Sequence, residues 1–210
     1  HQHPGGVWRD EIAGFIYERG ARSTTPLMGA AHNDLHHRFT GFIVNQGINP
    51  TKILDMGCGF GKSTWPFYEA FKYAQVEAID LSEPCVTLGA QEAALNTNNT
   101  IRYSQMDALK TVYENEEFDL ITSTMLIHEL PPTEIGQLFA EATRLLAPGG
   151  CMVHLDFHQV PNAFARFIHY GHAQRNNEPF MQPWAEMDPL TLMEEKGLTN
   201  LKVMPFQEAE

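Results

Sequence analysis

The chain has 210 residues, of which 43% are hydrophobic and 19% charged, and its formal net charge at pH 7 is −12. This length and composition suit one globular domain with a core of its own. Because proteins that hold a phosphate backbone concentrate Lys and Arg, the acidic balance argues against nucleic acid as a partner. Three cysteines without CxxC spacing favour a reducing, cytoplasmic setting, and no apolar run is long enough to predict a membrane span.

The first part of the chain predicts helices. The opening residues, HQHPGG, do not form a signal peptide; because the chain does not begin with Met, we interpret them as a tag remnant or as following a missing start. Apolar residues at helical spacing then predict helices over 8–21 and 32–47, the second ending at Gly47.

Strands and helices alternate through the middle of the chain. Short apolar runs bounded by turn residues predict strands over 52–57, 75–82, 101–107, 117–126 and 151–157. Between them, helical patterns cover 62–74, 83–96 and 132–146, the last stopped by APGG at 147–150. Since such alternation is typical of βαβ units, we predict an α/β fold with a parallel sheet and helices on both faces.

The stretch ILDMGCGFGKST, at 53–64, predicts a loop that holds a cofactor or nucleotide. A phosphate loop of the GxxxxGKS type needs glycine five residues before Gly61, where this chain has Met56. A dinucleotide loop needs GxGxxG, whereas the spacing from Gly57 is GxGxG. A loop for another adenosine-bearing cofactor is therefore favoured over a phosphate loop or a nicotinamide site. We interpret KST, at 62–64, as the first turn of the next helix.

Residues at the ends of the second and third predicted strands fit an adenosine. Asp80 can accept hydrogen bonds from two ribose hydroxyls, and Leu81 offers an apolar surface for an adenine face. Met106 and Asp107 place another apolar residue beside an acceptor for the adenine amino group. All four lie at carboxyl ends of parallel strands, where open α/β sheets bind ligands.

Five segments stand in the order and approximate spacing of the class I S-adenosylmethionine-dependent methyltransferases: ILDMGCGFG, VEAIDLSE, SQMDAL, FDLITSTMLIHEL and LLAPGGCMVHLDF. Over about 52–157 the chain resembles their small-molecule branch, which includes enzymes of ubiquinone and menaquinone biosynthesis. The resemblance implies a Rossmann-like sheet, S-adenosyl-L-methionine as cofactor and S-adenosyl-L-homocysteine as product. It also implies a seventh, antiparallel strand; because no candidate follows Phe206, we expect the C-terminus to be incomplete.

The resemblance also assigns cofactor contacts. Two glycines and an acid match the motif that contacts the methionine portion of the cofactor, and a second acid matches the residue that contacts its ribose. Later residues match the contacts to the adenine and the position near the cofactor's amino group. The residues at these positions, in chain order, are Asp55, Gly57, Gly59, Asp80, Met106, Asp107 and Thr124, with Leu81 beside the ribose acid.

The implied function is transfer of a methyl group to a small, partly apolar or aromatic molecule by in-line displacement. Such a reaction needs alignment and exclusion of water, and a base only where the acceptor loses a proton. His128, which follows the fourth predicted strand, is the candidate for positioning the acceptor or removing its proton, with Glu129 orienting its ring. Three alternatives stay open: a packing role for His128, an NAD(P)-dependent oxidoreductase, and a non-catalytic S-adenosylmethionine-binding module.

Histidines and aromatic residues predict the acceptor side of the site. His32 and His36 are four apart on a predicted helix, and His154, Asp156 and His158 alternate along the fifth strand, so each set shares a face. We interpret both sets as polar lining or lid residues and predict no metal site. The predicted acceptor pocket consists of Tyr17, His36, His158, Phe167 and Tyr170.

These elements predict a single domain. A helical lid covers 1–47 and the cofactor-binding core 48–158. The pattern becomes irregular over 159–186, which we interpret as a cap inserted after the fifth strand. The remaining residues, 187–210, predict a helix over 188–198, stopped by Gly197, and a strand over 199–207.

Overall fold

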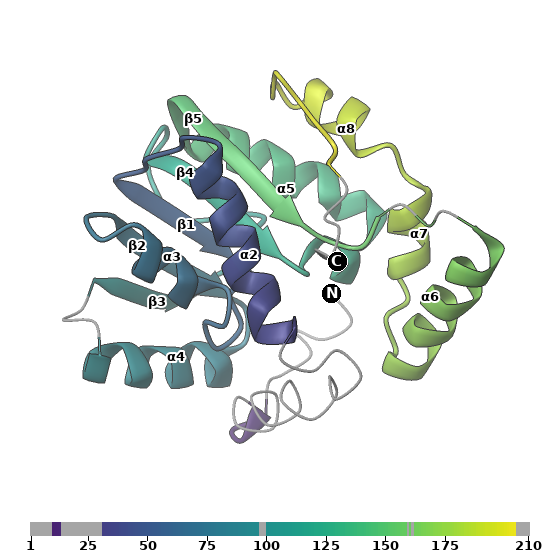
Figure 1. Cartoon of the computed structure of the whole chain (residues 1–210), viewed down its shortest axis with the longest axis horizontal. Coiled ribbons are helices and arrows are strands. Elements are labelled where there is room, and N and C mark those ends of the chain that lie inside the picture. The colour runs from purple at the N-terminus through teal and green to yellow at the C-terminus, as the bar shows by residue number, and fades with distance from the viewer. Residues whose placement is uncertain (1–9, 14–30, 97–99, 159, 161, 205–210) are drawn as a thin grey trace.

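A computed structural model describes residues 10–13, 31–96, 100–158, 160 and 162–204. Five parallel strands form one sheet in the order β3-β2-β1-β4-β5 (Figure 1). The strands are β1 (Lys52–Met56), β2 (Gln75–Asp80), β3 (Ile101–Gln105), β4 (Phe118–Thr124) and β5 (Leu146–Leu155). The direction of winding reverses between β1 and β4, which is the place where open α/β sheets bind ligands. The predicted α/β fold is confirmed.

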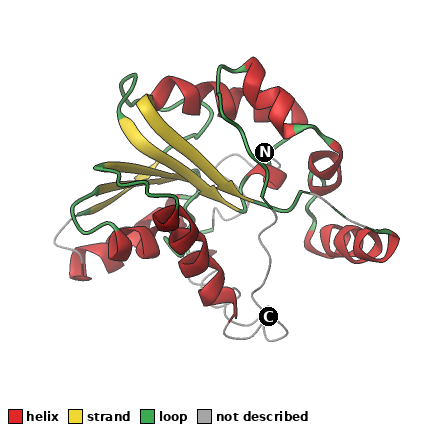
Figure 2. Ribbon diagram, turned by 45° about the horizontal axis from the view of Figure 1, so that its top comes forward, coloured by secondary structure: helices red, strands yellow, loops and turns green. Residues whose placement is uncertain are grey.

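Helices cover both faces of the twisted sheet (Figure 2). On one face lie α2 (Ala31–Asn45), α3 (Thr64–Ala70) and α4 (Glu83–Asn96). On the other lie α5 (Pro132–Leu145), α7 (Met181–Glu186) and α8 (Pro189–Glu195). A short 3-10 helix, η1 (Ile127–Glu129), follows β4, and α6 (Ala163–Asn176) stands beside α7, away from the sheet (Figure 1).

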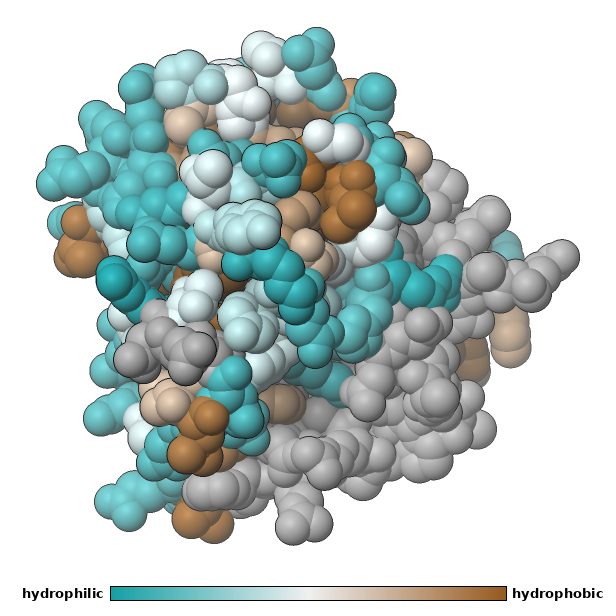
Figure 3. All heavy atoms as spheres, turned by 60° about the vertical axis from the view of Figure 1, so that its left-hand side comes forward, coloured by the Kyte–Doolittle hydropathy of each residue, from teal (hydrophilic) through white to brown (hydrophobic). Residues whose placement is uncertain are grey.

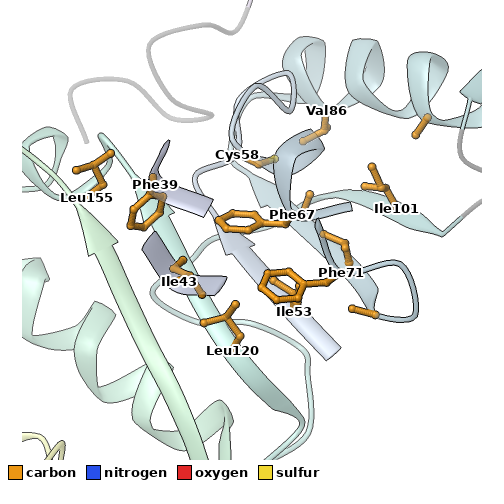
Figure 4. Close-up of a cluster of buried hydrophobic side chains, with 14 residues drawn as sticks. Phe39, Ile43, Ile53, Cys58, Phe67, Phe71, Val86, Ile101, Leu120 and Leu155 are labelled. Atoms are coloured by element: carbon orange, nitrogen blue, oxygen red, sulfur yellow. The ribbon is translucent and has the colours of Figure 1, made fainter. Parts of the chain in front are cut away.

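Alternation along the strands divides the core into two layers. Ile53 of β1 packs toward α2 and α3, in the cluster shown in Figure 4, where Phe39 and Phe67 meet edge to face at 6.1 Å. Leu54, one residue along, packs on the opposite face with α5. A strand buried on both sides needs apolar residues at successive positions, which explains why β1 reads as one apolar run.

Three segments differ clearly from the sequence predictions, and α3 is shorter, covering Thr64–Ala70 in place of 62–74. β5 begins at Leu146, so the APGG segment, predicted to be only a helix stop, lies in a strand whose register against β4 shifts between Phe118 and Leu120. The segment 159–186 contains α6 and α7 and is not irregular. Residues 199–204 form no strand, so the final predicted strand is wrong over its described part.

The helical pattern of α6 escaped detection because the helix does not bury a continuous apolar face. Phe164 and Phe167 are 74% and 73% exposed, and the side chain of Asn162 caps the helix by accepting from the Ala165 N–H. The predicted helix over 8–21 lies outside the described residues except for 10–13. The face drawn in Figure 3 is mainly hydrophilic, with separate apolar spots. Within the described ranges, no helix combines the length and apolar character needed to cross a membrane.

Candidate functional site

The glycine loop turns sharply at the carboxyl end of β1. Gly57, Gly59 and Gly61 have φ of 71°, 55° and 101°, in the region that favours glycine. A Cβ on Gly57 would lie 2.7 Å from the Leu126 side chain, and one on Gly61 would lie 1.9 Å from the Tyr103 hydroxyl. The loop therefore needs glycine both for its backbone conformation and for the close approach of its neighbours.

Asp55 ties this loop to the start of α3. Its carboxylate is buried and accepts from the hydroxyls of Ser63, at 2.8 Å, and Thr64, at 2.7 Å. Burial raises the pKa of Asp55 to about 6, although hydroxyl groups, including that of Thr122, oppose the rise. α3 begins at Thr64, two residues later than predicted, and the bonds of Ser63 and Thr64 to Asp55 were missed. The sequence does contain a signal for these bonds, because two hydroxyl residues, Ser63 and Thr64, follow the glycine loop and Asp55 lies at the end of the strand before it.

Asp80 lies where β2 ends, facing the same loop. One carboxylate oxygen accepts from the Gly59 N–H and the other from the Ser82 N–H, each at 2.8 Å. Burial raises its pKa, while these backbone donors lower it. Since both donors are backbone groups, Asp80 holds the loop and β2 in one arrangement and keeps its further lone pairs for another donor.

The adenine-side residues cluster around this acid. The Met106 N–H donates to the Asp80 carbonyl at 2.9 Å, which brings the ends of β2 and β3 together. Gln105 donates through Nε2 to the Leu81 carbonyl at 3.0 Å, and Asp107 accepts from the Leu109 N–H at 2.9 Å. Leu81, Met106 and Asp107 are half-buried, so they border the sheet edge without being sealed inside it.

Thr124 supplies a buried polar atom at the switch point. Among the described residues, its hydroxyl has no hydrogen-bond partner, although it is shielded from solvent. The next residue, Met125, has φ of 56°, a left-handed conformation that is strained for a side chain of this kind. Its N–H donates to the Leu155 carbonyl at 2.8 Å, which fixes the turn to the end of β5. Orphaned polar groups and strained backbone are both typical of ligand sites.

His128 lies in η1 and is held by an acid from the end of β5. Its Nδ1 is 2.6 Å from Oδ1 of Asp156, and the other Asp156 oxygen accepts from the Ile127 N–H at 2.7 Å. Burial lowers the pKa of His128, but the charge and hydrogen bond of Asp156, with the charges of Glu129 and Glu178, raise it to about 9. The predicted orienting residue, Glu129, is 3.8 Å from Nε2 and makes no hydrogen bond to the ring. Asp156 therefore replaces Glu129 in that role.

The histidines predicted to share one face of the fifth strand have separate partners. His154 pairs through Nδ1 with the Ser123 hydroxyl, and burial lowers its pKa to about 4. His158, beyond the end of β5, donates through Nε2 to the Met187 carbonyl at 3.0 Å, and its ring meets Trp184 at 4.9 Å. With Asp156 bonded to His128, these side chains form no common site.

The predicted acceptor pocket is dispersed in the structure. His36 is buried on α2, Phe167 is exposed on α6, and Tyr170 donates to Oε1 of Glu186 at 3.2 Å on the outer part of the cap. Tyr17 lies outside the described residues. The pocket roles of His36, His158, Phe167, Tyr170 and Tyr17 stay predictions.

Comparison with known proteins agrees with this geometry. Residues 53–150 match a family described as a methyltransferase domain. The ubiquinone/menaquinone biosynthesis C-methyltransferase UbiE of Dinoroseobacter shibae is 30% identical over 112 residues, which are 53% of this chain and 44% of that protein. This chain thus matches less than half the length of that relative.

Two solved structures share the fold. The first is the Haemonchus contortus phosphoethanolamine N-methyltransferase 2 with phosphomonomethylethanolamine and S-adenosylhomocysteine, at a TM-score of 0.66 and 17% identity, covering 93% of this chain and 44% of that one. The second is the [4+2]-cyclase SpnF, at a TM-score of 0.53 and 22% identity, covering 61% of this chain and 47% of that one.

The sheet order, the glycine loop and the acid at the end of β2 are those of the fold shared by the class I S-adenosylmethionine-dependent methyltransferases. More particularly, residues 53–150, slightly under half of the chain, match the methyltransferase domain family. The resemblance predicted from the five sequence segments is confirmed, and S-adenosylmethionine is the cofactor of this class.

Proposed function

We propose that the protein transfers the methyl group of S-adenosylmethionine to a small, partly apolar or aromatic acceptor. The observation that carries the proposal is the joint placement of the glycine loop, Asp80 and the buried Thr124 hydroxyl at the switch point of the sheet. The ubiquinone/menaquinone C-methyltransferase relative, named for small-molecule biosynthesis, supports the choice of acceptor class.

We further propose a division of roles among the site residues. Gly57 and Gly59 let the backbone approach the methionine portion of the cofactor, and Asp80 accepts from the ribose hydroxyls while it anchors the loop. The Thr124 hydroxyl, which is buried without a partner among the described residues, serves the methionine end. Leu81, Met106 and Asp107 border the adenine. Asp55 acts indirectly, since its carboxylate is bonded to Ser63 and Thr64 inside the protein.

S-adenosylmethionine supplies a methyl group that is already activated by its positive sulfur, so the chain contributes mainly alignment and exclusion of water. We propose that His128 positions the acceptor, because it is buried, held by Asp156 and placed directly after β4. A pKa of about 9 keeps its ring protonated at neutral pH, which disfavours proton removal by this group there.

A second candidate is a cofactor-binding protein of this fold with another activity. It is favoured by one observation, the structural match to a protein described as a [4+2]-cyclase, since that match shows that the fold alone does not decide the reaction. The family match favours S-adenosylmethionine over the nicotinamide alternative.

Calorimetric titration with S-adenosylhomocysteine and, separately, NADH tests the cofactor. We expect saturable binding of the first only, and binding weakened by about 1–3 kcal/mol in Asp80→Ala, because hydrogen bonds to a charged acceptor are lost. Glu195→Ala, on the exposed part of α8, is the matched control. Binding of NADH alone, or equal affinity in Asp80→Ala, would overturn the cofactor assignment.

Turnover is tested with methyl-labelled S-adenosylmethionine and a panel of phenols, quinols and aromatic amines. Labelled product in the wild type, and a much lower kcat in His128→Gln at unchanged S-adenosylhomocysteine affinity, would support the proposal. Tight cofactor binding without transfer to any member of the panel would favour the second candidate.

A further inference from the structure

Three side chains of types that commonly bind metal ions converge beside β4 and β5, outside the predicted cofactor contacts. His128 and Glu129 come from η1, and Glu178 comes from the turn between α6 and α7. One ligand atom from each residue lies within 4.8 Å of the other two. Segments separated by about fifty residues thus meet where α7 packs against η1, near the carboxyl end of β5 (Figure 1).

The imidazole is fixed so that one nitrogen faces this cluster. Nδ1 of His128 is engaged by Asp156 at 2.6 Å, which leaves Nε2 as the atom directed to the glutamates. The side chain is only 5% exposed, and the nearest charged atom to Nε2, Oε1 of Glu129, is 3.8 Å away, beyond hydrogen-bond distance. This ring nitrogen is therefore directed at the two glutamates and not at Asp156.

One of the two glutamates also has a carboxylate oxygen without a donor. Oε2 of Glu178 is shielded from solvent and accepts no hydrogen bond from the described residues; Nε2 of His172 is 3.6 Å away, beyond hydrogen-bond distance. Glu129, Glu178 and Asp156 together surround the single buried imidazole of His128. Without a metal ion, the protonated ring of His128 is the cation among these carboxylates, and a bound ion would replace the proton on Nε2.

We propose that His128, Glu129 and Glu178 bind a divalent transition-metal ion. One imidazole nitrogen and two carboxylate oxygens suit Zn²⁺, Mn²⁺ or Co²⁺, and three protein ligands leave coordination positions open for water or an acceptor oxygen. Ligand atoms that each lie about 2.0–2.2 Å from one Zn²⁺ ion are closer to one another than the 4.8 Å within which the three atoms lie here. Small side-chain rotations would therefore bring them to coordination distance. Asp156 takes the outer position, as a carboxylate that holds the histidine ring and sets its tautomer.

This inference contradicts the prediction of no metal site, and it does not rest on methyl transfer. The sequence suggested two other groups, His32 with His36 and the alternating residues 154, 156 and 158, whereas the structure unites His128 with a glutamate from the cap. Within the proposed function, the ion gives His128 a means of positioning an acceptor that carries an oxygen ligand.

The test uses Co²⁺ as the probe, titrated into the purified full chain and followed by visible absorption and calorimetry. We expect one equivalent to bind in the wild type, and binding to weaken at least about tenfold in Glu178→Gln, since loss of one ligand has at least the effect of an outer-sphere change. Glu129→Gln should weaken binding similarly and provides a second variant if Glu178→Gln does not fold. Folding is checked by circular dichroism and by S-adenosylhomocysteine titration.

Glu195→Gln and His37→Gln are the matched controls, because both residues are exposed and lie outside the cluster. Unchanged affinity in these controls, with loss in both cluster variants, would support the site. Absence of Co²⁺ binding in the wild type, or equal binding in folded cluster variants, would overturn it. Because S-adenosylhomocysteine binding is measured separately, failure of the metal site is distinguishable from failure of the methyltransferase proposal.

Discussion

Replacement of Gly61 by alanine should destabilise the protein through two separable effects. The first is conformational: an alanine at φ of 101° leaves the regions that L-residues favour, at a cost of about 1–2 kcal/mol. The second is steric, because the new Cβ would lie 1.9 Å from the Tyr103 hydroxyl and 2.8 Å from its ring carbon Cζ. Displacing a packed ring costs about 1–3 kcal/mol more.

Gly149 separates the two effects. It has φ of 82°, and a Cβ there would meet nothing within 4 Å, so Gly149→Ala should show the conformational cost alone. Urea unfolding should then place Gly61→Ala about 1–3 kcal/mol below Gly149→Ala in unfolding free energy. The moved loop should also bind S-adenosylhomocysteine more weakly, whereas Gly149→Ala should bind it normally.

The double variant Gly61→Ala/Tyr103→Phe tests the steric term. Removing the hydroxyl relieves the closest contact but leaves Cζ at 2.8 Å, so recovery should be partial. Equal stability of Gly61→Ala and Gly149→Ala, or no recovery in the double variant, would refute the claim that Tyr103 confines the loop.

Two further predictions concern buried polar groups. Asp55 has a folded-state pKa of about 6 against 3.8 for the free group, so the folded protein binds the proton of this carboxyl group more tightly than the unfolded chain does. The contribution of Asp55 to the free energy of unfolding should therefore fall by about 3 kcal/mol in total as pH rises from about 4 to about 6. Asp55→Asn should lack that fall, and identical pH dependence of urea unfolding in both proteins would contradict the assignment. The second prediction concerns Thr124→Val, which removes a buried hydroxyl that has no partner among the described residues. The free energy of unfolding should stay the same or rise by about 1 kcal/mol. Calorimetry should show affinity for S-adenosylhomocysteine about fivefold lower if the hydroxyl serves the cofactor, and unchanged affinity would dismiss that contact.

Local patterns were sufficient for most of the framework. The helix over 83–96 has the predicted bounds, because Ser82 and Pro84 mark its start and its pattern is not interrupted. β5 was misjudged at its beginning, since Gly149 and Pro148 are typical of turns, while pairing with β4 recruits this stretch into the sheet. α6 was missed because its exposed phenylalanines do not produce a one-sided apolar pattern.

The site divides in the same way. By itself, the sequence determined the parallel α/β class, the glycine loop, Asp80 as the acid at the end of the second strand, and the methyltransferase resemblance, because all of these depend on residues close together in the chain. Only the tertiary structure decided which distant groups meet: Asp156, rather than Glu129, holds His128, and Glu178 enters from the cap about fifty residues away. Packing of α7 against η1 creates that juxtaposition, and contacts across such separations leave no local spacing by which a sequence could reveal them.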